Sequence, residues 1–194
     1  MITDLSGGNR LTLRENMRSD QILFDFYTSL AARPLDDALR EARLLFPVTD
    51  RPATTIVISH ARRRFLNMRR NLAEKPTDAV FFRAPSVSKA GPQSMWLWSG
   101  VTVVGAGGAV KKGVFETVAH ATPEEVVLHS GTRLTVHQAV RSLRLAYALT
   151  YPSTQGLTLP GIVRLDCTAN RHFTWKHLYV GASRCTSHEL LEIA

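Results

Sequence analysis

The chain has 194 residues, of which 44% are hydrophobic and 21% are charged, a composition that favours one packed domain with room for a small insert and argues against intrinsic disorder. Twenty-four lysine and arginine residues against sixteen acidic ones give a formal net charge of +8, which favours a polyanionic partner but does not exclude an ordinary basic protein. Cys167 and Cys185 fit neither metal-ligand nor disulfide spacing.

Two further patterns bear on where the protein works. No apolar run in the sequence reaches membrane-spanning length, and the polar first ten residues do not form a secretory signal. Together with the sparse cysteines, these patterns predict a cytoplasmic or nuclear protein without a membrane partner.

The first part of the chain predicts helices around a buried strand. Ser19 or Asp20 can cap a helix whose apolar residues are Ile22, Leu23, Phe26, Tyr27 and Leu30. A proline-bounded connection containing arginine then leads to residues 54–59, a β-branched run that predicts a buried strand. Residues 60–72 predict a basic helix of amphipathic pattern, with arginines over most of its surface and one apolar side formed by Phe65, Met68 and Leu72.

The second part predicts a change of architecture and then a return. After a strand at residues 79–82, proline and glycine punctuate short strand-like runs at 95–98, 101–104, 114–119 and 125–128. We expect residues 85–142 to form a small antiparallel β-barrel inserted into an α/β domain made of residues 1–84 and 143–194. That domain resumes with a strand at 143–150, a strand at 162–165, a helix at 177–184 and a last strand at 190–193, which predicts a mostly parallel sheet flanked by helices.

Three separated segments resemble motifs IV, V and VI of superfamily-1 helicases of the RecD and UvrD type. They are Leu13-Arg-Glu-Asn-Met-Arg-Ser-Asp20, Ala148-Leu-Thr-Tyr-Pro-Ser-Thr-Gln-Gly-Leu-Thr158 and His177-Leu-Tyr-Val-Gly-Ala-Ser-Arg-Cys185. The resemblance covers nearly the whole chain, and the family carries a small Src-homology-3-like barrel just before motif V. It implies a RecA-like fold of the P-loop NTPase class and the carboxy-terminal half of an ATP-dependent DNA helicase.

The resemblance also assigns residues to an ATP site. Arg18 and Arg184 would be the catalytic arginines that reach the terminal phosphate, because a guanidinium is permanently charged and forks onto phosphate oxygens. Gln155 and Gly156 would bind the nucleotide with them, the glycine allowing close approach of backbone. The alternatives are an exposed arginine before a helix for Arg18 and a helix-surface salt bridge for Arg184.

A second set of residues would contact nucleic acid. Thr150 opens motif V, although a strand-end hydroxyl bonded to local backbone is an equal alternative for it. Ser59, His60, Arg63 and Asn67 resemble a Ser-His-x-x-Arg-x-x-x-Asn pattern at a strand-to-helix junction, a position suited to phosphate binding. The alternatives are a polar cap for His60 and a solvated helix face for the arginines. Trp96 and Trp98 share a strand face and either stack bases or fill a core.

Motif V also departs from the family pattern. Pro152 and Ser153 stand where the family commonly has histidine and lysine. Losing that lysine removes a phosphate contact or a link between the sites, which puts the coupling of ATP turnover to strand movement in question.

The residues that would bind most of the ATP and its Mg²⁺ are not found in this sequence. It contains no Gly-x-x-x-x-Gly-Lys-Ser/Thr loop and no acidic magnesium motif, and the glycines of residues 105–108 fit a hairpin turn. No metal site is predicted. We therefore expect a truncated or split helicase that is inactive alone, needs a P-loop-containing amino-terminal lobe, and binds single-stranded or forked DNA, with RNA possible. The competing hypotheses are a non-catalytic nucleic-acid-binding remnant and a protein-interaction module.

Overall fold

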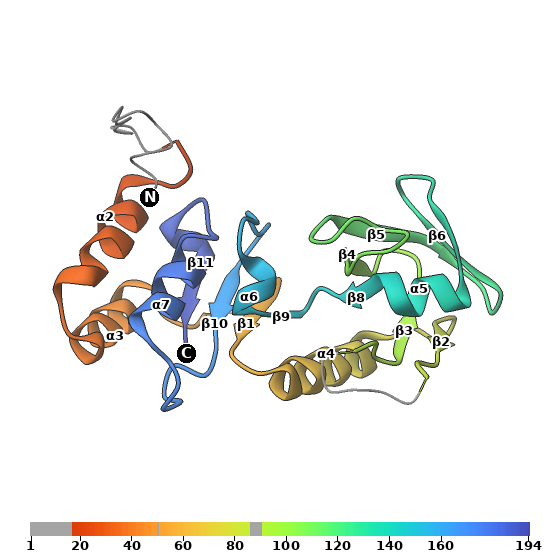
Figure 1. Cartoon of the computed structure of the whole chain (residues 1–194), viewed down its shortest axis with the longest axis horizontal. Coiled ribbons are helices and arrows are strands. Elements are labelled where there is room, and N and C mark those ends of the chain that lie inside the picture. The colour runs from red at the N-terminus through yellow and green to blue at the C-terminus, as the bar shows by residue number, and fades with distance from the viewer. Residues whose placement is uncertain (1–16, 50, 86–90) are drawn as a thin grey trace, which may run out of the picture.

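Four parallel strands form the first sheet of the computed structural model, which describes residues 17–49, 51–85 and 91–194 (Figure 1). The strand order is β11-β10-β1-β9, and the strands are β1 (Thr54–Val57), β9 (Ala148–Thr150), β10 (Val163–Leu165) and β11 (Leu191–Ile193). Three of the four are buried along their whole length, and Arg164 in β10 is half-buried, as expected for a parallel sheet covered on both faces. The predicted α/β class with a mostly parallel sheet is confirmed.

Helices flank this sheet (Figure 1). They are α2 (Gln21–Ser29), the 3-10 turn η1 (Leu30–Ala32), α3 (Leu35–Leu45), α4 (His60–Glu74), α6 (Tyr151–Thr154), α7 (Trp175–Ala182) and the 3-10 turn η2 (His188–Leu190). The first predicted helix is confirmed, and its cap is Asp20, whose carboxylate accepts a hydrogen bond from the Leu23 amide at 2.8 Å. None of the helices in the described ranges is long and apolar enough to cross a membrane.

The predicted connection before β1 is wrong, because it contains the helix α3. Pro34 stands just before the first turn, where a missing amide donor costs nothing. Asp36 and Asp37 in that turn complement the helix dipole. The buried side is formed by Ala38, Leu39 and Ala42, which recur at helical spacing, so the sequence does carry the period that the predicted connection overlooked.

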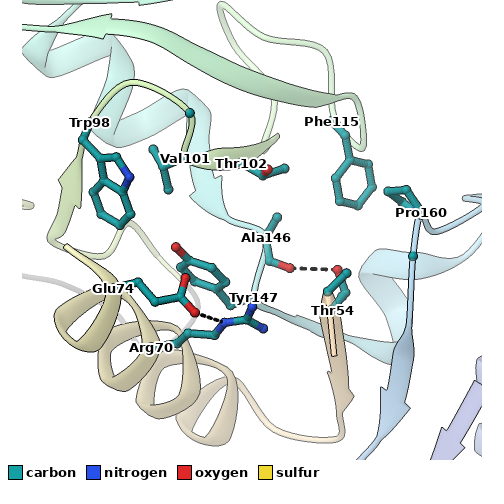
Figure 2. A pocket seen from close by; sticks show the side chains of 13 residues that line it. Thr54, Arg70, Glu74, Trp98, Val101, Thr102, Phe115, Ala146, Tyr147 and Pro160 are labelled. Carbon is teal, nitrogen blue, oxygen red and sulfur yellow. Dashed lines mark hydrogen bonds and ion pairs between the residues drawn. The ribbon is translucent and has the colours of Figure 1, made fainter. Parts of the chain in front are cut away.

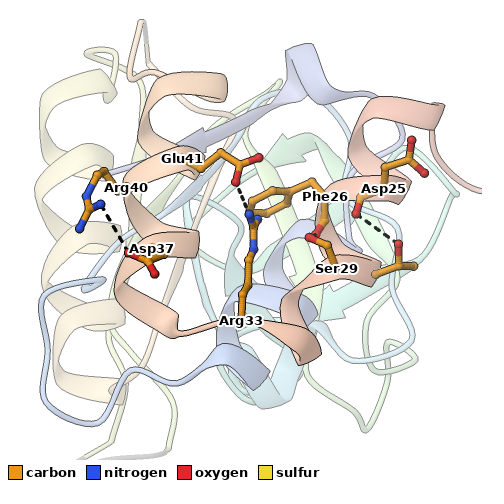
Figure 3. A network of polar contacts seen from close by, with 8 residues as sticks. Asp25, Phe26, Ser29, Arg33, Asp37, Arg40 and Glu41 are labelled. Atoms are coloured by element: carbon orange, nitrogen blue, oxygen red, sulfur yellow. Dashed lines mark hydrogen bonds and ion pairs between the residues drawn. The ribbon is translucent and has the colours of Figure 1, made fainter.

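One arginine joins α2 to α3. Arg33 follows η1, pairs with Glu41 of α3, and holds its guanidinium 5.6 Å from the centre of the Phe26 ring (Figure 3). The ion pair is partly solvated and adds little by itself, but it fixes the turn between two helices that share the core with α7.

A second sheet contains five antiparallel strands in the order β7-β6-β5-β4-β8. These are β4 (Thr102–Gly105), β5 (Phe115–Ala121), β6 (Glu125–Leu128), β7 (Arg133–Thr135) and β8 (Leu143–Leu145), and α5 (Val136–Ser142) packs beside them. A short antiparallel pair, β2 (Val80–Phe82) and β3 (Met95–Leu97), completes this part of the fold. The antiparallel sheet, α5 and the β2–β3 pair share one apolar core, which is separate from that of the parallel sheet.

The segment 143–150, predicted as one strand, is two strands in different sheets. Leu145 of β8 pairs with β4, and Ala148 of β9 pairs with β1 three residues later. The Thr54 hydroxyl donates to the Ala146 carbonyl at 3.0 Å and holds the crossing in place. A cavity of about 510 Å³ lies beside it (Figure 2).

The side chains that line this cavity already bond to one another. The Arg70 Nε donates to Glu74 at 2.7 Å, and its guanidinium lies 4.7 Å from the centre of the Tyr147 ring (Figure 2). Trp98 packs against the second core, whereas Trp96 lies on Phe81 with ring centres 5.0 Å apart. Of the two alternatives for the tryptophans, packing is the one observed for Trp98.

The amphipathic pattern of α4 is inverted in the fold. Its buried residues are Arg63, Asn67 and Asn71, whereas Phe65 is 53% and Leu72 is 48% exposed. The asparagines are buried because their amides pair with strand backbone. Asn67 donates to the Ala148 carbonyl at 3.1 Å and accepts from the Ala148 amide at 2.8 Å. Asn71 forms the same pair of bonds with Trp96, at 2.9 and 2.8 Å.

We predict that Asn67→Ala lowers the free energy of unfolding by about 3 kcal/mol, because it leaves the amide and carbonyl of Ala148 buried without partners. Phe65→Ala, on the exposed side of the same helix, should change that free energy by less than about 0.5 kcal/mol. Urea denaturation of both variants measures the difference. A larger loss in Phe65→Ala than in Asn67→Ala would contradict the inverted packing.

Candidate functional site

Arg18 and Arg184 meet at one carbonyl group. Arg18 donates through Nη2 to the Leu157 carbonyl and to the Thr158 hydroxyl, both at 3.1 Å. Arg184 donates through Nη1 to the same Leu157 carbonyl at 3.0 Å. The structure therefore brings together two arginines that lie near opposite ends of the described chain.

The two arginines differ in burial. Arg184 is 8% exposed, and its guanidinium also donates to the carbonyls of Val180 at 2.9 Å and Thr154 at 3.4 Å. Burial and the nearby Arg18 charge lower the pKa of Arg184. Its partners are carbonyls and the Ser183 hydroxyl rather than a carboxylate, so the helix-surface salt bridge is not the arrangement observed.

Gln155 and Gly156 lie at the end of α6, next to this pair. Both are exposed, and Gly156 has a φ of +80°, with no atom within 4 Å of the position a β-carbon would take. A residue other than glycine would be strained there by its backbone conformation alone. The segment thus offers open main chain beside two guanidinium groups.

A basic pocket of about 340 Å³ lies at the other end of α6. It contains three of the residues predicted to contact nucleic acid, His60, Arg63 and Thr150, and two basic residues that the sequence did not point to, Lys112 and Arg144. The pocket sits where β1 and β9 end, since Val57 pairs with Thr150. Lys112 comes from the hairpin between β4 and β5 and Arg144 from β8, so only the tertiary fold brings them here.

Arg63 places a buried positive charge in the wall of the basic pocket. It is 6% exposed, and its Nε and Nη2 have no hydrogen-bond partner in the described part of the chain. Burial, Arg144 and Arg64 lower the pKa of Arg63 to about 10, so the folded state carries the cost of this charge at every pH below that value. The described lining of the pocket includes no carboxylate.

Other polar groups around the pocket already form hydrogen bonds within the protein. Burial lowers the pKa of Arg144, and its Nη1 donates to the carbonyls of Val140 and Leu143. Ser59 caps α4 by accepting from the Arg62 amide at 3.1 Å, which places His60 in the first turn. Burial and Arg63 lower the pKa of His60, so this imidazole favours its neutral form. The arrangement as a whole favours an anion.

Thr150 and Ser153 bond to each other. The Thr150 hydroxyl lies 3.0 Å from the Ser153 hydroxyl, which donates to the Thr150 carbonyl at 2.7 Å. This is the local bonding considered as an alternative for Thr150. Pro152 occupies the first turn of α6, where no helical amide bond is lost. Asn67, also predicted to contact nucleic acid, is 1% exposed and is held by β9, so its observed role is structural.

Metal binding finds no support from the acidic, histidine and cysteine residues. Within residues 17–49, 51–85 and 91–194, no group of three or more such side chains could hold a metal ion. The two candidate sites, the arginine pair and the basic pocket, are both built around cationic side chains.

Solved structures of Pif1 helicases share this fold. The Pif1 helicase from Candida albicans matches with a TM-score of 0.61 and 19% identity, over 90% of this chain and 53% of that one. Bacteroides Pif1 bound to ssDNA matches with a TM-score of 0.62 and 15% identity, over 92% and 50%. The Pif1 helicase from Bacteroides in complex with ADP-AlF3 and ssDNA matches with a TM-score of 0.59 and 16% identity, over 91% and 49%.

The comparison establishes that this chain shares the fold of these Pif1 helicase structures. The structural neighbours are Pif1 helicases rather than the RecD and UvrD type expected from the motifs. This chain spans about half the length of each of those structures. No protein-family model and no curated protein matches the sequence.

We predict that Arg63→Met raises the free energy of unfolding by about 1–3 kcal/mol, because an apolar side chain of similar length replaces a buried charge without a counter-charge. Arg40→Met, at an exposed position on α3, should stay within about 0.5 kcal/mol of the parent. Urea denaturation at neutral pH provides the measurement. A marked loss of stability in Arg63→Met would mean that this guanidinium is a structural group.

Proposed function

We propose that this chain is the carboxy-terminal RecA-like half of an ATP-dependent DNA helicase. The observation that carries the proposal is the meeting of Arg18 and Arg184 at the Leu157 carbonyl, beside the open backbone of Gly156. The fold shared with Pif1 helicases supports it, and one of those neighbours is a complex with ADP-AlF3 and ssDNA.

The arginine pair fits the phosphates of a nucleotide held by a second lobe. ATP with Mg²⁺, bound mainly by that P-loop-containing lobe, would supply the phosphoryl group whose transfer drives movement. Arg18 is exposed and can extend toward the second lobe. Arg184 would keep its Nη1 bond to the Leu157 carbonyl and exchange the partners of Nε and Nη2 for phosphate oxygens, which also accept a forked pair of hydrogen bonds. Gln155 and Gly156 would complete the edge that faces the nucleotide.

The basic pocket fits a phosphodiester group of single-stranded or forked DNA, and RNA has the same backbone charge. Arg63, Arg144 and Lys112 supply positive charge, and the amino-terminal end of α4 adds its dipole. The exposed His60 in the first turn of α4 and the Ser59 cap place main-chain donors near the same site. Structural neighbours include Pif1 bound to ssDNA and two coordinating Pif1 helicases at forked dsDNA.

We also propose a division of the chain that matches these roles. Residues 1–84 and 143–194 would form the RecA-like domain, and residues 85–142 would form the insert. The separate core of the antiparallel sheet supports an insert, and that core also includes Phe82 from before residue 85 and Leu143 and Leu145 from after residue 142. Because β8 pairs with β4, the first residues of the returning segment would complete the sheet of the insert.

A second candidate function is a non-catalytic nucleic-acid-binding remnant. The bonding of Ser153 to Thr150 favours it, because the position that carries a lysine in the family is occupied here by a short cap. This candidate keeps the basic pocket and predicts that the arginine pair no longer affects nucleotide turnover.

We predict that binding of single-stranded DNA weakens as the salt concentration rises. For three cationic contacts, the logarithm of the association constant should fall with the logarithm of the salt concentration with a slope of about −2. Arg63→Met should reduce the steepness of that slope by about 0.7, the share of one phosphate contact. Fluorescence anisotropy at several salt concentrations measures both, with Arg40→Met as the matched control. A salt-independent affinity would favour the interaction-module hypothesis.

We predict no ATP hydrolysis by this chain alone and DNA-stimulated hydrolysis when a cognate P-loop lobe is added. In that mixture Arg18→Ala should slow turnover by about 10³- to 10⁵-fold, because a phosphate-stabilising arginine is lost. Arg184→Lys keeps a charge but loses the fork, and it should also slow turnover. Circular dichroism confirms that each variant is folded. Absence of DNA-stimulated hydrolysis in the mixture would support the remnant, and full turnover in both variants would refute the role of the arginine pair.

A further inference from the structure

Leu157 lies between the basic pocket and the arginine pair and contacts both. Its carbonyl accepts the hydrogen bonds of Arg18 and Arg184. Its side chain lies against Gly113, where a β-carbon would come within 2.8 Å of the Leu157 Cδ2. Gly113 itself lines the basic pocket next to Lys112. One residue therefore connects a wall of the pocket to both guanidinium groups.

The connection is stiff on the pocket side. The Gly113 amide donates to the Gly105 carbonyl at 2.9 Å, and the Gly105 amide donates to the Val114 carbonyl at 2.8 Å. A β-carbon at Gly105 would lie 2.1 Å from the Lys111 carbonyl oxygen, so the two arms of this hairpin are in close contact. A ligand that fixes Lys112 would also fix Gly113.

The connection is also stiff on the arginine side. The Leu157 amide donates to the Thr154 carbonyl at 3.0 Å, and the Leu159 amide donates to the Arg184 carbonyl at 3.0 Å. The segment 157–159 is thus bonded to the main chain of Arg184 as well as to its guanidinium. Fixing Leu157 would restrict both arginines.

We propose that Leu157 is a positioning residue that transmits occupation of the basic pocket by a nucleic-acid phosphate to Arg18 and Arg184. This inference rests on the proposed function. A phosphate bound at Lys112 orders the hairpin, the hairpin orders the Leu157 side chain through Gly113, and the Leu157 carbonyl then holds the two guanidinium groups in one place. The hydroxyl of Ser153 caps α6 through its bonds to Thr150, so it is not available to link the two sites. The contact through Leu157 would take the place of a direct side-chain link at that position.

The first test measures amide hydrogen exchange of the full chain with and without a short oligothymidylate. In the parent, the oligonucleotide should slow exchange of the Leu157 and Leu159 amides by about fivefold or more, the lower end of typical couplings between sites. Leu157→Ala should still bind the oligonucleotide but lose the slowing at Leu159. Leu35→Ala is the matched control, because Leu35 is also half-buried against the same core but lies on α3.

The outcomes separate this inference from the proposed function. Failure of the parent to bind the oligonucleotide overturns both. Binding without slowed exchange in the parent, or with equal slowing in Leu157→Ala, overturns only the role of Leu157. Loss of slowing in Leu35→Ala as well would also overturn it, because the effect would then follow core packing in general.

The second test uses a pair of glycines with the same φ angle. Gly113 and Gly131 both have a φ of +83°, but a β-carbon at Gly131 would meet nothing within 4 Å. Gly113→Ala and Gly131→Ala therefore both place a side chain at an unfavourable positive φ, and only Gly113→Ala also pushes on Leu157. We expect faster exchange at Leu159 in Gly113→Ala alone, and its reversal when Leu157→Ala is added. Equal exchange at Leu159 in the two glycine variants would refute the contact as the link.

Discussion

The pairing of two asparagine side chains with strand backbone determines how the parts of this protein are placed. Asn67 bonds both main-chain groups of Ala148 in β9, and Asn71 does the same for Trp96 in β3. Each amide acts as a short continuation of a strand edge, which satisfies donors and acceptors that would otherwise be buried without partners. Because the two residues are one helical turn apart, α4 joins the parallel sheet to the β2–β3 pair.

This use of α4 explains why a charged residue is buried at its start. Arg63 is one turn before Asn67 on the same side of the helix. The orientation of α4 that buries the two asparagines therefore also buries Arg63, close to the charge of Arg144. An arginine in that setting destabilises the folded state unless an anion is bound. A sequence that keeps such a residue where an apolar one would pack better is typical of a binding site rather than of a core.

The sequence predicted the elements whose period is set by burial of apolar side chains. The runs that became β1, β10 and β11 are short, apolar and bounded by turn residues, and the helix α2 shows its apolar spacing openly. The helix α3 was predictable as well, since its buried Ala38, Leu39 and Ala42 recur at helical spacing. The sequence could not predict the inversion of α4, whose buried side is polar. That inversion depends on which strands the helix packs against, and local spacing does not contain this information.

The candidate sites divide in the same way. Arg18, Arg184 and Gly156 were identified because the motifs that carry them are contiguous, and the structure gathers them. Lys112 and Arg144 were missed because neither belongs to a motif, and a hairpin and a strand of the second sheet bring them to the pocket. The helix α6 lies between the pocket and the arginine pair, and its four residues extend about 6 Å at the usual rise per residue. Two sites this close need no long-range pathway, since a single packed side chain, that of Leu157, can carry a change at one to the other.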